Sequence, residues 1–234
     1  MKKIIVTGGS GRFGSILKKY KTKYTIYFPT RSRMDIKKYR SIDNYIKKIK
    51  PDYFIHCAAI SRPMKIHDKD INQSINTNII GTCNVVMACQ KYNTKLLYFS
   101  TNYVYPKHKG IYRETDPIFP INNYGWSKLG GEAAVQMYKN SLILRTCMTE
   151  NPFLHSRAFY NVKSNYMFHE DVVKILFKVL NLKGILNIGG PTQSVFDFAK
   201  KFNPKVKKIK CNFRHIPLSS VMNISKLKKK IKKR

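Results

Sequence analysis

The chain has 234 residues, a length that suits one large domain or one domain with a small appendage. Hydrophobic residues make up 43% of it, enough for a sizeable core, yet no apolar run is long enough to cross a bilayer. The five cysteines form no C-x-x-C pair and have no zinc-like spacing with histidine, so we expect neither a disulfide framework nor a metal site. These features exclude a membrane-spanning protein and a small disulfide-rich protein.

The net charge of +33 comes from 45 Lys and Arg against 12 Asp and Glu. Lysines are spread along the whole chain, and residues 198–234 contain no acidic residue. A run of like charges is usually a solvated or frayed chain end, so we expect no nucleic-acid partner, while binding of other polyanions stays open. The N-terminus enters a strand pattern at once and has no secretory leader pattern, which predicts a cytoplasmic protein.

Short β-rich apolar runs alternate with amphipathic stretches along the chain. Strands are predicted at Lys3–Thr7, Tyr24–Phe28, Tyr53–Cys57, Lys95–Ser100, Ser141–Arg145 and Ile185–Ile188. Helical spacing of apolar residues predicts helices between them, two long ones being Ile71–Tyr92 and Tyr124–Tyr138. Uniformly apolar strands that alternate with helices are typical of an α/β fold with a parallel sheet covered on both faces. The segment Thr146–Phe168 has no periodicity and is the candidate for a substrate loop or small lobe.

A glycine-rich turn follows the first predicted strand. Thr7-Gly8-Gly9-Ser10-Gly11-Arg12-Phe13-Gly14 satisfies both G-x-x-G-x-x-G and G-x-G-x-x-G, and a helical pattern begins at Ser15. Glycines permit a tight turn and close approach of a pyrophosphate, and the N–H groups at the helix start bind phosphates. The turn predicts a dinucleotide site that contains Gly8, Ser10, Gly11, Arg12, Phe13 and Gly14. The absence of G-K-S/T argues against a P-loop nucleotidase.

The end of the second predicted strand carries the signal for the choice between NAD and NADP. NAD binders usually place a carboxylate there for the ribose hydroxyl, whereas an arginine accommodates the 2′-phosphate of NADP. Here Arg31 and Arg33 come first, and the first acid is Asp35. NADP(H) is therefore favoured over NAD(H), with chance placement of arginines as the competing explanation in so basic a chain.

Tyr124 and Lys128 are four residues apart, so on a helix they share a face. A nearby ammonium favours the phenolate, so we expect Lys128 to lower the pKa of Tyr124 from its ordinary value of about 10. Such a tyrosine can give a proton to a carbonyl oxygen while a hydride moves at carbon. An exposed Tyr/Lys pair on an amphipathic helix is the alternative for an isolated Y-x-x-x-K.

In this order the motifs resemble the extended short-chain dehydrogenase/reductase family, and within it the dTDP-4-dehydrorhamnose reductase branch. The similarity runs along nearly the whole chain, through Pro51–Ala59, Asn78–Thr82, Ser100–Tyr105, Tyr124–Glu132, Leu144–Thr146, His169–Val172 and Gly184–Gly190. It implies a Rossmann-type doubly wound parallel sheet with a reduced C-terminal substrate-binding lobe. Residues 1–145 would bind NAD(P) and carry the catalytic triad. Residues 146–234 would form a shortened substrate lobe with returning Rossmann elements and the basic tail.

The resemblance also implies roles for the matching residues. Thr101 would hydrogen-bond the substrate carbonyl, Tyr124 would donate the proton, and Lys128 would tune the tyrosine and hold the nicotinamide ribose. Further cofactor contacts would come from Asp35, Ile36, Ala58 and Ala59, and Asn78 would have a supporting role. The implied reaction is NADPH-dependent reduction of the 4-keto group of a nucleotide-linked 4-keto-6-deoxyhexose. The implied partner is a nucleotide sugar, and a homodimer stays open.

Two departures from the family pattern limit what the resemblance implies. Asn102 stands where reductases commonly have aspartate and dehydratases begin an Asp-Glu pair, which argues against dehydratase chemistry. The chain is also shorter than most members of the branch, mainly between Arg145 and His169, where the nucleotide-sugar pocket is normally built. Two alternatives stay open: an NAD-dependent nucleotide-sugar epimerase of the same family, and a non-catalytic cofactor-binding regulatory protein.

Overall fold

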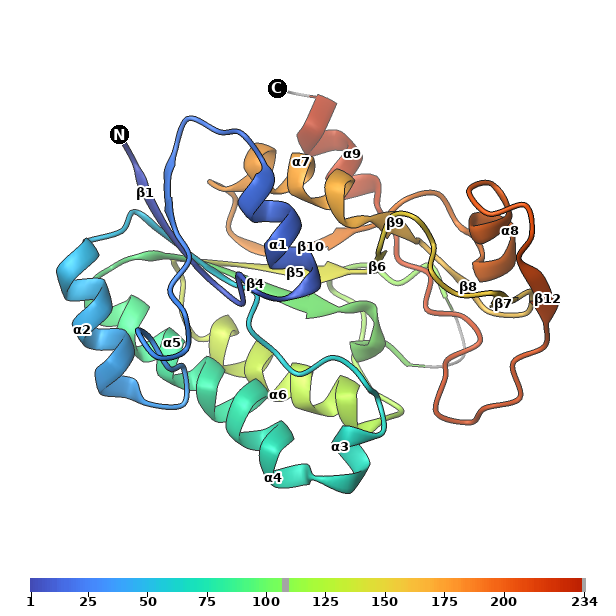
Figure 1. Ribbon diagram of the computed structural model, residues 1–234, viewed down its shortest axis with the longest axis horizontal. Helices are drawn as coiled ribbons and strands as arrows, with labels where there is room; N and C mark the ends of the chain where they lie inside the picture. Colours follow the sequence, from blue (N-terminus) through green and yellow to red (C-terminus); the bar gives the residue numbers. More distant parts are fainter. Residues whose placement is uncertain (107–109, 233–234) are drawn as a thin grey trace.

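A six-stranded parallel sheet forms the centre of the molecule (Figure 1). The computed structural model describes residues 1–106 and 110–232. In spatial order the strands are β10 (Gly184–Ile188), β5 (Ser141–Thr146), β4 (Lys95–Thr101), β3 (Tyr53–His56), β1 (Lys3–Thr7) and β2 (Thr25–Tyr27). All neighbouring pairs in this sheet are parallel. The six predicted strands and the α/β fold class are confirmed, with strand ends within one residue of the prediction.

Helices cover both faces of the sheet (Figure 1). One face carries α1 (Arg12–Lys19), α7 (His169–Val179) and α9 (Ser225–Lys232), and α7 packs against both of the other two. The opposite face carries α2 (Tyr39–Ile49), α5 (Gly81–Lys91) and α6 (Asn123–Gln136), with α5 between the other two. Over residues 1–106 and 110–232, no helix is both long and apolar enough to span a membrane.

The strands are apolar on both sides, as buried parallel strands require. Along β1, Ile4 and Val6 join the core beneath α1 and α7, whereas Ile5 joins the core beneath α2 and α5. All seven residues of β4, in the middle of the sheet, are buried. The sheet is therefore a rigid base whose strand ends hold side chains in fixed positions.

The last helix changes the interpretation of the basic tail. In α9, Leu227 is buried and Ile231 packs against the same apolar core, while all five lysines are exposed. The tail was expected to be a solvated or frayed end, but this amphipathic spacing docks it on β10 and α7 instead. Lys233 and Arg234, the last residues of the predicted tail, lie outside the described residues.

The segment predicted as one long helix is helical throughout but changes its hydrogen-bonding pattern. After α3 (Ile66–Lys69) come α4 (Ile71–Ser74), a π-helical segment (Ile75–Ile80) and then α5. The buried Asn78 lies in the π segment, where it donates to the Ser127 hydroxyl at 2.9 Å and accepts from the Ile60 amide at 2.8 Å. Single π turns are frequent at functional sites, because they re-aim a side chain within a helix. Here the turn ties α6 to the loop after β3.

A small lobe projects from one end of the sheet (Figure 1). It consists of β6 (Met148–Thr149), β7 (Arg157–Phe159), β8 (Lys163–Ser164), β9 (Met167–Phe168), β11 (Gln193–Ser194), α8 (Val195–Lys200) and β12 (Lys207–Ile209). Its strands form three two-stranded ladders, β6 with β9, β7 with β12 and β8 with β11. The lobe has its own aromatic core, which includes Phe153, Phe168 and Phe198.

Candidate active site

Three cavities lie along the edge where the strands end, and shared residues connect them. The glycine cavity, of about 520 Å³, is lined by the turn after β1. The central cavity, of about 290 Å³, is lined by the end of β4 and by α6. The lobe cavity, of about 360 Å³, lies against β7. Gly8, Gly11, Cys57 and Ala59 line both of the first two cavities, and Arg62, Tyr103 and Tyr166 line both of the last two. In open α/β sheets ligands bind at this carboxyl edge.

The glycine turn packs closely against neighbouring backbone and leaves the start of α1 uncapped. Gly8 has a φ of +74°, and a Cβ there would lie 2.8 Å from the Ala58 amide nitrogen. A Cβ on Gly14 would overlap the carbonyl oxygen of Gly8, so α1 can pack this close to the turn only with glycine. No side chain caps the start of α1, which leaves its first N–H groups available to an anion. Of the predicted residues, Gly8, Ser10 and Gly11 line the glycine cavity, and Gly11, Arg12, Phe13 and Gly14 line the central cavity.

Cations surround the outer part of the glycine cavity. Arg31 lines it as predicted, together with Lys18 and Lys37, which the sequence analysis did not single out. Asp35 also lines it, but its carboxylate accepts from the Lys37 amide at 3.0 Å and lies 3.7 Å from the Arg31 guanidinium. The remaining predicted contacts, Ile36, Ala58 and Ala59, line the same cavity.

Arg33 is not brought to this cavity. It lines a separate hollow with Tyr27 and Tyr45, on the α2 side of the chain. The backbone turns between Thr30 and Met34, since the Met34 amide donates to the Thr30 carbonyl, and this turn separates the side chains of Arg31 and Arg33. The structure thus does not bring Arg33 together with Arg31, and a cofactor contact of Arg33 stays a prediction.

The three predicted catalytic residues meet in the central cavity. Thr101 ends β4, and its hydroxyl opposes the rise in the pKa of the Tyr124 phenol. Tyr124 and Lys128 lie one turn apart on α6, whose start is fixed by the Asn122 side chain, which accepts from the Gly125 amide at 2.8 Å. The Tyr124 ring lies 5.2 Å from the ring of His67 and 5.9 Å from that of Tyr103, so aromatic neighbours orient it.

The electrostatics of the pair differ from the sequence expectation. Burial raises the pKa of Tyr124, against the lowering effects of the Thr101 hydrogen bond and the Arg62 charge. Burial lowers the pKa of Lys128 to about 7, and its ammonium nitrogen lies 4.2 Å from the centre of the Tyr98 ring. The expectation that Lys128 lowers the pKa of Tyr124 is therefore wrong for this structure, because desolvation dominates both groups and Arg62 supplies the opposing positive charge.

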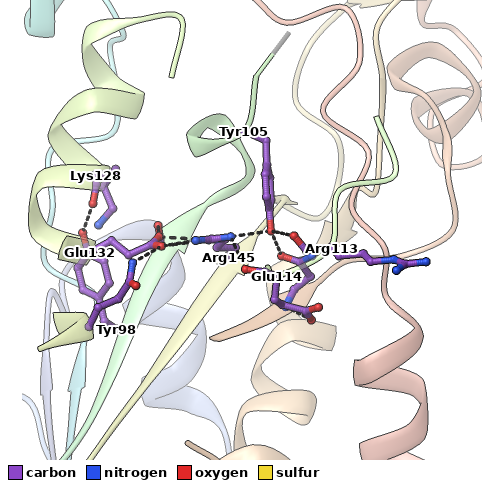
Figure 2. Close-up of polar contacts among 10 residues, drawn as sticks. Tyr98, Tyr105, Arg113, Glu114, Lys128, Glu132 and Arg145 are labelled. Atoms are coloured by element: carbon purple, nitrogen blue, oxygen red, sulfur yellow. Dashed lines mark hydrogen bonds and ion pairs between the residues drawn. The ribbon is translucent and has the colours of Figure 1, made fainter. Parts of the chain in front are cut away.

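A buried ion pair fixes α6 to the sheet. Figure 2 shows Glu132 of α6 facing Arg145 of β5, and the guanidinium donates to the carboxylate at 2.6 Å. The Ser100 hydroxyl at the end of β4 donates to the same carboxylate at 2.5 Å. On its other side Arg145 donates to the Tyr105 hydroxyl at 2.8 Å, which in turn donates to Asn187 of β10. The helix that bears Tyr124 is thus held by direct contacts to β4 and β5, and Arg145 and Tyr105 extend the network to β10.

Asn102 stands where the family commonly has an aspartate, and its side chain contacts the lobe. It is 4% exposed, and its amide nitrogen donates to the Ser220 hydroxyl at 2.7 Å and to the Ser164 hydroxyl at 3.0 Å. The amide thus joins the end of β4 to two separate segments of the chain beside the central cavity.

Cysteine chemistry is not supported at this site. Cys147 lines the central cavity, but burial raises the pKa of its thiol to about 12, and the Ser164 hydroxyl donates to its sulfur at 3.1 Å. A thiol with such a pKa stays protonated near neutral pH and is a poor nucleophile. Within residues 1–106 and 110–232, no three His, Cys, Asp or Glu side chains group in a way that could hold a metal.

Comparison with known proteins identifies the family to which the chain belongs. A sequence profile described as RmlD substrate binding domain matches residues 1–152. The chain belongs to the RmlD substrate-binding-domain family. The predicted resemblance is confirmed by a 28% identical relative, the dTDP-4-dehydrorhamnose reductase of Aggregatibacter actinomycetemcomitans, over 204 residues, which are 83% of this chain and 64% of the relative. The spore coat polysaccharide biosynthesis protein SpsK of Bacillus subtilis is 30% identical over 62% of this chain and 53% of its own length.

Solved structures of this RmlD family share the whole fold. The crystal structure of dTDP-4-dehydrorhamnose reductase from Bacillus anthracis, in complex with NADP, superposes with a TM-score of 0.89 at 25% identity, over 97% of this chain and 91% of that one. A further relative is methionine adenosyltransferase 2 subunit beta of Xenopus laevis, 27% identical over 62% of this chain and 46% of its own. The chain thus spans less than two thirds of the length of these curated relatives.

The structure adds site residues that the sequence analysis of this RmlD family member missed. Arg62, Glu150 and His169 line the central cavity with the predicted catalytic residues. One oxygen of Glu150 lies 2.8 Å from the Arg12 guanidinium and 3.3 Å from that of Arg62. Burial lowers the pKa of His169, which is 6% exposed. Arg62 and Glu150 each follow closely after a strand, and that position was the only signal that could have suggested them.

Proposed function

We propose that the chain is an NADPH-dependent reductase of a nucleotide-linked 4-keto-6-deoxyhexose. The single observation that carries the proposal is the central cavity, which unites Thr101, Tyr124 and Lys128 with the end of the glycine turn. The relatives named dTDP-4-dehydrorhamnose reductase support the substrate class. Because the chain covers only 64% of the first of them, activity and substrate are proposed for this chain rather than transferred.

The glycine cavity fits a dinucleotide. Its turn packs against Ala58 too closely for a Cβ at Gly8, and the uncapped start of α1 offers N–H groups to a pyrophosphate. Lys18, Arg31 and Lys37 give the outer part three cations against the single carboxylate of Asp35, which favours a cofactor with an extra phosphate. The Bacillus anthracis structure contains NADP, which supports the same choice. When bound, NADPH supplies the hydride.

The residues of the central cavity supply the proton. The phenol of Tyr124 gives its proton to the carbonyl oxygen of the substrate, and the Thr101 hydroxyl hydrogen-bonds that oxygen and orients it. Since burial lowers the pKa of Lys128 to about 7, its side chain can gain or lose a proton near neutral pH one turn from the phenol. Arg62 opposes the rise in the pKa of Tyr124 and so eases the loss of the phenolic proton.

The lobe cavity supports a substrate with a nucleotide attached. It adjoins the central cavity through Tyr103 and Tyr166 and is also lined by Phe153, Phe159 and Arg157. Aromatic side chains and an arginine are suited to stack on a base and to pair with phosphate. We propose that residues 1–145 hold the cofactor and residues 146–234 complete the substrate side.

The test is the decay of NADPH absorbance with a panel of nucleotide-linked 4-keto-6-deoxy sugars. We expect turnover with one panel member and a loss of at least about a hundredfold in kcat for Tyr124→Phe, because general acid catalysis contributes about a hundredfold or more. The variant should bind NADPH as the wild type does. No turnover by the wild type across the panel, or full turnover by the variant, would contradict the proposal.

A second candidate is a non-catalytic subunit that binds a cofactor and regulates a partner. The similarity to methionine adenosyltransferase 2 subunit beta favours it. NADPH binding without oxidation by any panel sugar, together with co-purification of an enzyme that the chain activates, would select this candidate. An epimerase would instead retain a tightly bound NAD that does not exchange.

A further inference from the structure

Arg62 is the charged residue at the junction of the central and lobe cavities. The two other residues that line both cavities are Tyr103 and Tyr166. The Arg62 charge opposes the burial-driven rise in the pKa of Tyr103, Tyr124 and Tyr166, so it acts on side chains of both cavities. Its side chain is 43% exposed, so the guanidinium is accessible to solvent.

Glu150 forms ion pairs with both Arg62 and Arg12. A single carboxylate oxygen lies 2.8 Å from Arg12 and 3.3 Å from Arg62. Arg12 begins α1 directly after the glycine turn, Arg62 belongs to the loop after β3 and Glu150 follows β6, so the carboxylate connects three separate segments. Burial raises the pKa of Glu150, but a backbone hydrogen bond and the two arginines outweigh burial and bring that pKa to about 2. Glu150 is therefore an anion at neutral pH.

The order of the cavities fixes where a diphosphate must lie. If the keto sugar reacts beside Tyr124 in the central cavity and the base occupies the lobe cavity, the diphosphate between them crosses the junction. We propose that Arg62 binds the diphosphate of the nucleotide-sugar substrate, and that Glu150 is a built-in substitute for that anion which the substrate displaces. The inference rests on the proposed function and adds the residue that holds the phosphates.

The exchange is favourable because a diphosphate offers a guanidinium more acceptor oxygens and more negative charge than one carboxylate does. In the absence of substrate, Glu150 keeps Arg62 aligned but also competes for it. Removing the Arg62 charge should weaken binding, whereas neutralising Glu150 should strengthen it. Arg12 contacts the same Glu150 oxygen from the side of the glycine turn. Replacing Arg12 also removes one ion-pair partner of Glu150, so Arg12→Gln is the matched control for Arg62→Gln.

The experiment is a calorimetric titration of the full chain, saturated with NADP⁺, with dTDP, UDP, thymidine or inorganic pyrophosphate. We expect Arg62→Gln to weaken binding of the preferred nucleoside diphosphate about tenfold or more, which is the loss typical of a charge-assisted contact. The affinity for thymidine, which has no phosphate, should not change. Glu150→Gln should tighten the same binding about threefold or more. Arg12→Gln should leave it within about twofold but raise the KM for NADPH.

The outcomes separate this inference from the proposed function. Unchanged diphosphate affinity in Arg62→Gln, with normal NADPH oxidation by the wild type, would overturn the inference and leave the reductase standing. Weaker binding in Glu150→Gln would show that the carboxylate only aligns the arginine, which also overturns its role as a substitute anion. The expected titration pattern without any NADPH oxidation would instead refute the reductase. Binding of pyrophosphate that Arg12→Gln weakens as much as Arg62→Gln would place the anion on the cofactor side and contradict the inference.

Discussion

Neutralising Glu132 should destabilise the fold more than any single exposed charge change. Glu132 is 0% exposed and Arg145 2%, so Glu132→Gln leaves a buried guanidinium without its counter-charge. The carboxylate accepts from Arg145 at 2.6 Å and from Ser100 at 2.5 Å, and an amide in its place directs two N–H groups at donors. Breaking a buried ion pair from one side costs about 3–5 kcal/mol, a large part of the roughly 5–15 kcal/mol that stabilises a typical domain.

The assay is urea unfolding followed by circular dichroism, with the free energy of unfolding obtained by linear extrapolation. Asp171→Asn is the matched control, because it neutralises an exposed partner of Lys174 on α7 and should leave the unfolding free energy within experimental error. The double variant Glu132→Leu with Arg145→Met should be more stable than Glu132→Leu alone, since it removes the unpaired charge. A loss below about 1 kcal/mol for Glu132→Gln would refute the reasoning that this pair fixes α6.

Two further predictions concern the site. Lys128 has a folded pKa of about 7 against an ordinary 10.5, so the unfolded chain binds more protons between these pH values, and unfolding free energy should rise with pH across that window. Lys128→Met should remove up to about 5 kcal/mol of this rise. The measurement is the free energy of urea unfolding from pH 6 to about 10.5. Burial also lowers the pKa of Lys95 to about 8, but Lys95 contributes equally to the rise in both proteins. A slope equal to that of the wild type would contradict the burial of the Lys128 charge. Gly14→Ala should lower the free energy of unfolding by about 1–3 kcal/mol and weaken NADPH binding, because its methyl group overlaps the Gly8 carbonyl oxygen. Gly11→Ala is the control: its methyl group would lie 3.2 Å from the same oxygen, so the variant should fold nearly as the wild type does. Equal stability of the two glycine variants would refute the packing argument.

The sheet could be predicted because each buried strand is a short apolar run that stands out locally. The grouping of Thr101 with Tyr124 and Lys128 could be expected because the family motifs mark all three residues and because Tyr124 and Lys128 have helical spacing. Both signals are local in the chain, and local signals survive folding when the surrounding pattern is consistent.

The rest of the site depends on contacts that no local pattern reports. Arg62 and Glu150 are 88 residues apart, and their pairing is set by how two irregular loops cross the strand ends. The displacement of Arg33 from the cofactor cavity follows from a single turn after β2. The direction of the pKa change at Tyr124 depends on burial, which is a property of the assembled site and not of Y-x-x-x-K.

The short ladders of the lobe give the site two walls of different local stability. Each lobe ladder joins strands of only two or three residues, whereas β4 has seven buried residues in the middle of the central sheet. Amide protons of the lobe should therefore exchange through local opening, while those of β4 wait for global unfolding. The wall formed by the central sheet holds its side chains in fixed positions. The wall formed by the lobe can open locally to fit ligands of different size without displacing those side chains.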